Sequence, residues 1–239
     1  MYLQEFLNEL IYNELSDLYS STNLLYLTIT DDHRKIFSLM NSGILDLCTR
    51  IKLKEKECDL YQRVNKSFYY IRSTHVGNPF AGDEDIYIDG TGDDPPNKDI
   101  IRWLEAFDVD GNEVFINSPN HPYDIFTPQL DVMKITQEVD VDVRIISLVY
   151  QACYPKIVVT DDFDIETYEL LFPSFINKAL CLYIAAAMYS GKGGKSTEKR
   201  SMADKYLYQY ESEVLKIISL CLAPDKENEN SSFENNGWV

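Results

Sequence analysis

Apolar residues at helical spacing occur at both ends of the chain. They recur over residues 2–19 and 32–52 near the N-terminus, and over 173–191 and 197–222 near the C-terminus. Side chains three and four positions apart share one face of a helix, so the pattern predicts two helices at each end. Helices with one apolar face bury that face against one another. We therefore expect a helical bundle built from both ends of the chain.

Residues at the ends of these segments support the same boundaries. Thr30 can cap the second helix, and Asp31 and Asp32 place negative charge in its first turn, where the helix dipole favours it. Pro173 suits the first turn of the third helix, and Pro224 ends the fourth.

The middle of the chain follows a different pattern. Short runs rich in β-branched and aromatic residues alternate with turn-forming residues, which is typical of strands. The sequence Asp110-Gly111-Asn112 between two such runs predicts a hairpin turn. With the terminal helices, these runs predict an α+β fold whose inserted β-rich region is sandwich-like or barrel-like. The predicted strands are 57–64, 68–72, 86–88, 100–107, 114–117, 130–135 and 142–151.

These assignments divide the chain into two regions. We expect residues 1–56 and 168–223 to form the helical bundle and residues 57–167 to form the β-rich region. The boundaries follow the change from helical to strand-like periodicity.

Two segments fall outside both patterns. Residues 74–99 are rich in Gly, Pro and Asp and predict a long loop, either mobile or ordered on a neighbouring molecule. Residues 224–239 form a polar tail that is expected to be flexible on its own. Phe233 and Trp238 could anchor this tail on a partner.

The composition limits the function classes. The chain has 239 residues, 45% of them hydrophobic, enough to bury a core. No apolar run approaches the ~20 residues of a membrane span, and Glu5 and Glu9 stand where a secretory signal would be basic. We therefore expect a cytosolic protein. The net charge of -17 argues against coating nucleic acid, because that mode needs clustered Lys and Arg.

The five cysteines indicate a reduced protein. Their number is odd and no pair has the CxxC spacing. Cys48, Cys181 and Cys221 fall within apolar helical patterns, and Cys58 and Cys153 lie near predicted strands. We interpret the cysteines as packing residues and not as metal ligands or disulfide partners.

Two short motifs resemble ligand-binding loops without completing them. Residues 191–196 read Gly-Lys-Gly-Gly-Lys-Ser, but a phosphate-binding loop needs Gly where Tyr189 stands, and a strand where a helix is predicted. Residues 108–112 resemble the start of a calcium loop, but Glu113 and Pro119 replace the required Gly and Glu. An inter-helix turn and a hairpin turn are the favoured interpretations.

Acidic residues and histidines define no site either. Six acidic residues could attract a hard cation or a basic partner, although a solvated loop is favoured. The histidines are scattered without an HExxH motif, and no GxSxG motif occurs. We therefore assign no catalytic, cofactor-binding or metal-binding residue and expect a protein that is not an enzyme. The acidic residues are Asp83, Glu84, Asp85, Asp89, Asp93 and Asp94, and the histidines are His33, His75 and His121.

Four segments form an ordered set of motifs. The second predicted helix carries the pattern N-x-G-I-x-x-L-x-x-R, formed by Asn41, Gly43, Ile44, Leu47 and Arg50, and leads into a basic segment. Later segments read FDVDGNEVFIN, LVYQACYPKI and PSFINKALCLYIAAAMYSG. In this order, the segments resemble the head-to-tail connector (adaptor, or ring) proteins of tailed bacteriophages, especially the podovirus and crAss-like types. The resemblance covers most of the chain, apart from the loop and the tail.

The resemblance implies a structural role. Connector proteins form a ring beneath the portal protein, between the DNA-filled head and the tail, and the genome passes through it. The implied partners are copies of the same chain, the portal protein, and tail or further connector proteins, with no membrane, cofactor or catalytic residue. The implied location is the virion, after synthesis in the bacterial cytoplasm. An acidic wall would suit a conduit that DNA passes without sticking.

Three other interpretations stay open. The chain could be another tail-completion or minor tail protein of a virion. It could be an unrecognised enzyme or nucleotide-binding factor, for which the Gly-Lys-Ser turn is the best argument. It could also be a soluble adaptor unrelated to phages, which predicts a stable monomer.

Overall fold

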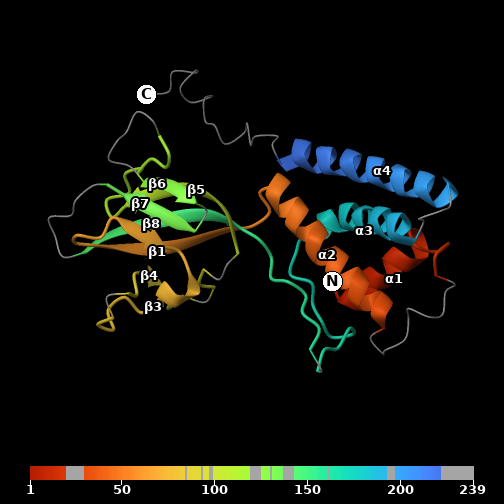
Figure 1. The fold of residues 1–239 in the computed structure, drawn as a ribbon, viewed down its shortest axis with the longest axis horizontal. Helices are drawn as coiled ribbons and strands as arrows, with labels where there is room; N and C mark the ends of the chain where they lie inside the picture. Colours follow the sequence, from red (N-terminus) through yellow and green to blue (C-terminus); the bar gives the residue numbers. More distant parts are fainter. Residues whose placement is uncertain are drawn as a thin grey trace, which may run out of the picture. The chain divides into compact units, whose positions relative to one another are not determined.

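The computed structural model has an α+β fold made of two compact units (Figure 1). Met1–Ile51 and Lys156–Val239 form the helical unit, and Lys52–Pro155 form the β unit. The boundaries lie earlier in the chain than the sequence predicts, because residues 156–167 belong to the helical unit. The structure describes residues 1–19, 30–83, 85–92, 94–96, 99–118, 125–129, 131–136, 143–160, 162–192 and 197–221.

The helical unit contains the four predicted helices. They are α1 (Leu3–Asn13), α2 (Asp31–Arg50), α3 (Asn177–Lys192) and α4 (Thr197–Cys221), with the short helix η2 (Ser174–Ile176) before α3. Helix α1 is shorter than predicted, because the chain turns after Asn13. Leu15 and Tyr19 lie in these turns and are still buried, which made the apolar pattern look longer than the helix.

Helix α3 forms the centre of the helical unit. It packs against α1, α2 and α4, and it runs alongside α4 in Figure 1. Most of its side chains are therefore buried, in agreement with its broad apolar face. They include Ala179, Leu180, Cys181, Leu182, Ile184, Ala185, Met188 and Tyr189.

The start of α2 confirms the predicted cap. The Thr30 hydroxyl accepts a hydrogen bond from the His33 backbone N–H at 3.3 Å, and the Thr30 N–H donates to His33 Nδ1 at 3.1 Å. Asp31 and Asp32 occupy the first turn. The side chains of Thr30 and His33 thus form hydrogen bonds with backbone N–H groups that have no partner within the helix.

The β unit consists of two sheets (Figure 1). The five-stranded sheet has the order β3-β4-β1-β8-β5, in which β1 and β8 are the long central antiparallel pair. The three-stranded sheet has the order β2-β7-β6. The strands are β1 (Glu55–Arg63), β2 (Phe68–Tyr70), β3 (Val76–Gly77), β4 (Ile88–Asp89), β5 (Ile100–Asp108), β6 (Ile125–Gln129), β7 (Val132–Ile135) and β8 (Val143–Ala152).

Both sheets contribute to one core. Strands β1, β5 and β8 supply apolar side chains from one sheet, and β2, β6 and β7 supply them from the other. This arrangement is the sandwich-like form that the alternating strand pattern predicts. The core includes Leu60, Tyr69, Tyr87, Ala106, Ile125, Met133, Ile135, Ile146, Leu148 and Tyr150.

The predicted strand at 114–117 is wrong. This segment makes only isolated bridges, from Glu113 to Phe107 of β5 and from Ile116 to Ile125 of β6. It therefore connects an edge of each sheet. The true strand β6 was missed because it contains Pro128, which is tolerated there because β6 is an edge strand.

Residues 74–99 are not a loop throughout. They contain β3 and β4, which extend the five-stranded sheet beside β1. Tyr87 and Ile88 are fully buried in the core. The predicted strand at 86–88 overlaps β4, whereas β3 was missed, because a strand of two residues is too short to leave a periodic signal.

Candidate interaction surfaces

The Gly-Lys-Ser segment follows a helix, as predicted. Helix α3 continues through Gly191 to Lys192, and α4 begins at Thr197. Residues 193–196 lie outside the described residues. The strand that a phosphate-binding loop requires does not precede this segment, because α3 occupies that place.

Asp108 organises the predicted turn after β5. Its Oδ1 accepts hydrogen bonds from the backbone N–H groups of Asp110 at 3.0 Å and Asn112 at 2.9 Å. The Gly111 φ angle of 80° explains why glycine stands there. Hydrogen bonds from the side chain and backbone of Asn112 lower the pKa of Asp108. These contacts show Asp108 acting as a turn-stabilising acceptor.

Three of the acidic residues of 83–94 serve the β unit itself, and Glu84 and Asp93 lie outside the described residues. Asp83 and Asp89 accept hydrogen bonds from backbone N–H groups two residues further on. Asp94 contacts Lys54 Nζ at 2.8 Å and Lys56 Nζ at 2.7 Å. Such partners within the chain give these three carboxylates a structural role.

Lys56 is the buried centre of an ion-pair network. Its side chain is 6% exposed, and its Nζ contacts Asp94 Oδ1 at 2.7 Å, Asp99 Oδ2 at 2.8 Å and the Pro95 carbonyl at 3.2 Å. Burial lowers the pKa of Lys56, but the hydrogen bonds that its ammonium group donates to Asp94 and Asp99 outweigh this effect and raise the pKa overall. The network ties the end of the 74–99 segment to β1.

The described histidines take part in packing. His33 is fully buried beside the α2 cap, and its ring stacks on Phe37 with centroids 6.2 Å apart. His75 stacks on Tyr87 at 4.8 Å, and its Nδ1 lies 2.8 Å from the Asp85 carbonyl. His33 and His75 belong to different units, and His121 lies outside the described residues.

Over the described ranges, no three His, Cys, Asp or Glu side chains come together in a way that could hold a metal ion. No helix in the same part of the chain is long and apolar enough to cross a membrane. Cys48, Cys58 and Cys181 are buried, and burial raises the pKa of Cys58 to about 12, as expected for a packing thiol.

The outer side of the three-stranded sheet carries exposed aromatic rings. Phe68 of β2 and Phe126 of β6 both pair in register with Lys134 of β7, so the three side chains share one row across the sheet. Tyr70 lies two residues from Phe68 on the same side. The exposed fractions are 46% for Phe68, 41% for Tyr70 and 53% for Phe126. We name Phe68, Tyr70, Phe126 and Lys134 the aromatic face.

Cations lie against these rings. Lys134 Nζ is 5.7 Å from the centroid of Phe68, and the Arg72 guanidinium is 5.2 Å from that of Tyr70. Arg72 Nε also contacts Asp131 at 3.0 Å. Among the described residues, two cations and one carboxylate thus lie at the aromatic face, in a chain whose net charge is -17. Exposed aromatic rings with Arg beside them are typical of protein interfaces.

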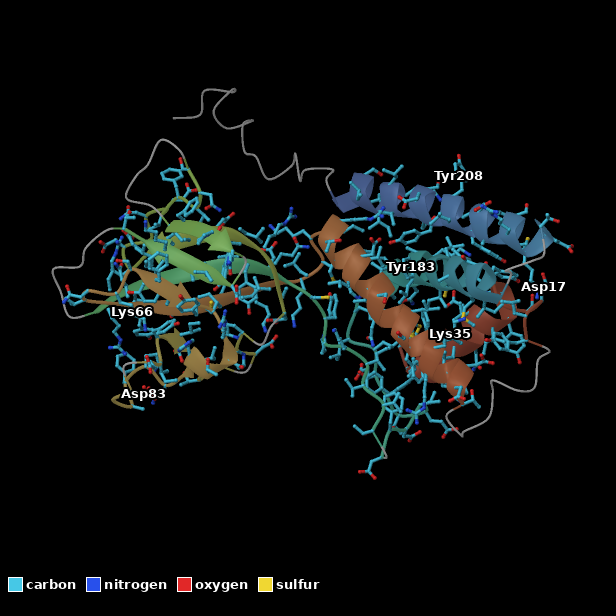
Figure 2. All side chains as sticks on the ribbon, in the orientation of Figure 1. Asp17, Lys35, Lys66, Asp83, Tyr183 and Tyr208 are labelled. Atoms are coloured by element: carbon cyan, nitrogen blue, oxygen red, sulfur yellow. The ribbon has the colours of Figure 1, made fainter. Side chains whose placement is uncertain are left out.

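A second exposed apolar surface lies on α4. Leu207, Tyr208 and Leu215 are 49%, 78% and 65% exposed. Leu215 follows Tyr208 by seven positions and Leu207 by eight, which is about two helical turns. The three side chains therefore lie on one side of α4 and form a stripe. Figure 2 shows Tyr208 projecting from α4 on the side away from α3. We name these three residues the α4 stripe.

Sequence reasoning missed both surfaces in part. The apolar spacing over residues 197–222 did not show which apolar residues face outward: Leu207 is exposed, and the buried side is formed by Tyr206, Tyr210 and Val214. The alternation of Phe68 and Tyr70 was a usable signal for the aromatic face, because residues two apart share one side of a strand. The contribution of Phe126 to the aromatic face was missed because strand β6, which carries it, was not predicted.

Tyr210 joins α4 to α2. Its hydroxyl donates a hydrogen bond to Asp46, which also contacts Arg50 Nε at 3.0 Å. Arg50 in turn contacts Glu211 at 2.7 Å. Burial raises the pKa of Tyr210, so its hydroxyl stays protonated and donates.

Tyr210→Phe is expected to lower the free energy of unfolding of the helical unit by about 1–2 kcal/mol, because one buried hydrogen bond to a carboxylate is lost. Urea unfolding followed by the helical circular dichroism signal measures this. The control is Tyr208→Phe, which removes the same hydroxyl from a largely exposed ring and should change stability little. Equal effects of the two substitutions would contradict the role of the Asp46 bond.

Two residues of the α2 motif, Asn41 and Gly43, contact segments from the C-terminal half of the chain. The Asn41 side chain donates to the Ile157 carbonyl at 3.0 Å and accepts from the Ile157 N–H at 2.8 Å. A Cβ atom on Gly43 would lie 2.7 Å from Leu180 Cδ1 and 2.8 Å from Tyr183 Cδ1. Segments far apart in the sequence thus depend on Asn41 and Gly43 for their packing.

No protein-family model matches the chain, and no curated protein matches it.

Proposed function

We propose that this chain is a structural virion protein, a subunit of a ring in the head-to-tail connector of a tailed phage, through which the genome passes. The observation that carries the proposal is the exposure of large apolar side chains on both units, on the α4 stripe and on the aromatic face. Apolar patches of this kind mark surfaces that other chains cover. The proposed ring supplies these chains as further copies and as portal and tail proteins.

Two further observations support a structural role. The titratable residues examined as candidate sites serve turns, caps and ion pairs of the fold, as Asp108, His33 and Lys56 illustrate. Two of the residues that carry the resemblance to connector proteins, Asn41 and Gly43, also pack the helical unit together. The negative charge of the chain suits a wall past which DNA moves, because like charges reduce sticking.

The α4 stripe provides a test with the chain alone. Tyr208→Ser combined with Leu215→Ser should leave the fold intact and raise the protein concentration needed for self-assembly at least tenfold, since a buried aromatic anchor commonly contributes 2 kcal/mol or more, on the order of what a tenfold change requires. Analytical ultracentrifugation measures the assembly. Leu220→Ser is the matched control, because Leu220 is 77% exposed on another side of the same helix. A chain that stays monomeric at every concentration, with or without these substitutions, would contradict self-assembly through α4.

Electron microscopy of the purified chain mixed with the portal protein of the same phage tests the ring itself. The expected result is a closed ring bound to one end of the portal. A particle map that places the chain elsewhere in the tail would favour a tail-completion or minor tail protein. Nucleotide binding that is lost in Lys195→Ala would favour a nucleotide-dependent factor instead.

A further inference from the structure

The aromatic face differs from the α4 stripe in its charge. Lys134 and Arg72 lie against its rings, and Asp131 is paired with Arg72. An acidic segment that carries aromatic residues would complement this surface, because its carboxylates would meet cations and its rings would meet rings.

The chain itself contains a segment of this chemistry. Residues 224–239 hold four acidic residues and one lysine, a net charge of -3, together with Phe233 and Trp238. From Cys221, the last described residue of α4, to Trp238 there are 17 residues. Fully extended, they would reach roughly 55 Å. This is longer than α4, whose 25 residues span about 37 Å. The segment is therefore long enough to reach a neighbouring copy.

We propose that the C-terminal segment 224–239 of one subunit binds the aromatic face of a neighbouring copy, with Phe233 and Trp238 on the rings of Phe68, Tyr70 and Phe126. Its carboxylates lie near Lys134 and Arg72. That the segment comes from a neighbouring copy rests on the proposed self-assembly. The contact between the segment and the aromatic face does not depend on that proposal. The contact is polar at its rim and aromatic at its centre, as in many protein interfaces.

The test measures binding of a fluorescently labelled peptide of residues 222–239 to the full chain by anisotropy. The receptor carries Phe233→Ala and Trp238→Ala, so that its own segment cannot compete. Adding Phe68→Ser and Phe126→Ser to the receptor should weaken peptide binding at least tenfold. Adding Phe80→Ser instead should leave binding unchanged, because Phe80 is 75% exposed in the same unit but lies outside the aromatic face. A second variant, Lys134→Glu, should also weaken binding and make it less sensitive to salt.

A receptor that keeps its native C-terminal segment shows whether the aromatic face binds the segment of a neighbouring copy or its own. If neighbouring copies bind there, a larger share of the aromatic faces should be closed to the labelled peptide as the concentration of the native chain rises. Inhibition that is independent of protein concentration would mean that each chain binds its own segment, and it would overturn the intermolecular proposal. Peptide binding that is absent, or equally affected by Phe80→Ser, would overturn the contact itself. If microscopy shows rings but the peptide does not bind, only this inference is contradicted. If the peptide binds but no rings form, only the proposed connector role is contradicted.

Discussion

Gly43→Val is expected to lower the free energy of unfolding of the helical unit by about 2–3 kcal/mol, because the added side chain overpacks a filled interface. Even the first added carbon would lie within 3 Å of atoms of Leu180 and Tyr183 on α3. Leu180 is fully buried and cannot move aside without disturbing the centre of the unit. The two γ-methyl groups of valine increase the conflict. Urea unfolding followed by the helical circular dichroism signal measures the loss.

Ser42→Val provides the matched control for this substitution. It places the same side chain at the next position of α2, which is exposed to solvent. Valine has a similar helix propensity to serine, so stability should change by less than about 0.5 kcal/mol. A Gly43→Val protein as stable as the Ser42→Val protein would mean that α2 and α3 do not approach as closely as the structure shows.

Lys56→Met is expected to destabilise the β unit by about 2–3 kcal/mol, because methionine fills the space of the lysine stem but leaves the carboxylates around it without their cation. Asp99 is the more affected partner, since its side chain is only 17% exposed. Urea unfolding followed by Trp103 fluorescence in a Trp238→Phe background reports on this unit, because the chain has two tryptophans.

Lys52→Met is the matched control for the Lys56 network. Lys52 pairs with Glu55 at 2.5 Å, and both side chains are close to half exposed, so loss of this surface pair should cost no more than about 0.5 kcal/mol. If both substitutions reduced stability equally, the buried network would not be the cause of the Lys56 effect.

The pH dependence of the Lys56 effect follows from two pKa shifts. Hydrogen bonds from Lys54 and Lys56 lower the pKa of Asp94 below 3.8, so its contribution is present above that pH and lost as the pH falls through the folded pKa. The pKa of Lys56 is raised above 10.5, so its contribution is present below that pH and lost as the pH rises through the folded pKa. The stability difference between the native chain and Lys56→Met should therefore be largest between pH 3.8 and 10.5.

Features governed by local periodicity could be predicted from the sequence. The four helices, the Thr30 cap and the long strands β1, β5 and β8 all lie close to their predicted positions. Each depends on side chains within a few residues of one another. Their physical signal is therefore contained in a short window of sequence.

Features that depend on partners far away in the chain were missed. Nothing local indicates that Lys56 would bind Asp94 and Asp99, about forty residues later. The two-residue strand β3 exists because β4 offers it an edge, and the exposure of Leu207 depends on how α4 rests on α3. Contacts between residues far apart in the chain decide which of several locally possible structures a segment adopts. These contacts cannot be read from the local pattern of a single sequence.

The helical unit is assembled from the first 51 residues and from residues after 155. During synthesis, α1 and α2 leave the ribosome without α3, the helix that buries their apolar faces. The whole β unit is translated in the interval, which at typical rates of protein synthesis lasts roughly 5–20 s. The β unit is thus complete before the two N-terminal helices can bury their apolar faces on α3, which emerges with the last third of the polypeptide. Newly made chains halted before α3 should accordingly be the most aggregation-prone species on the path to the finished subunit.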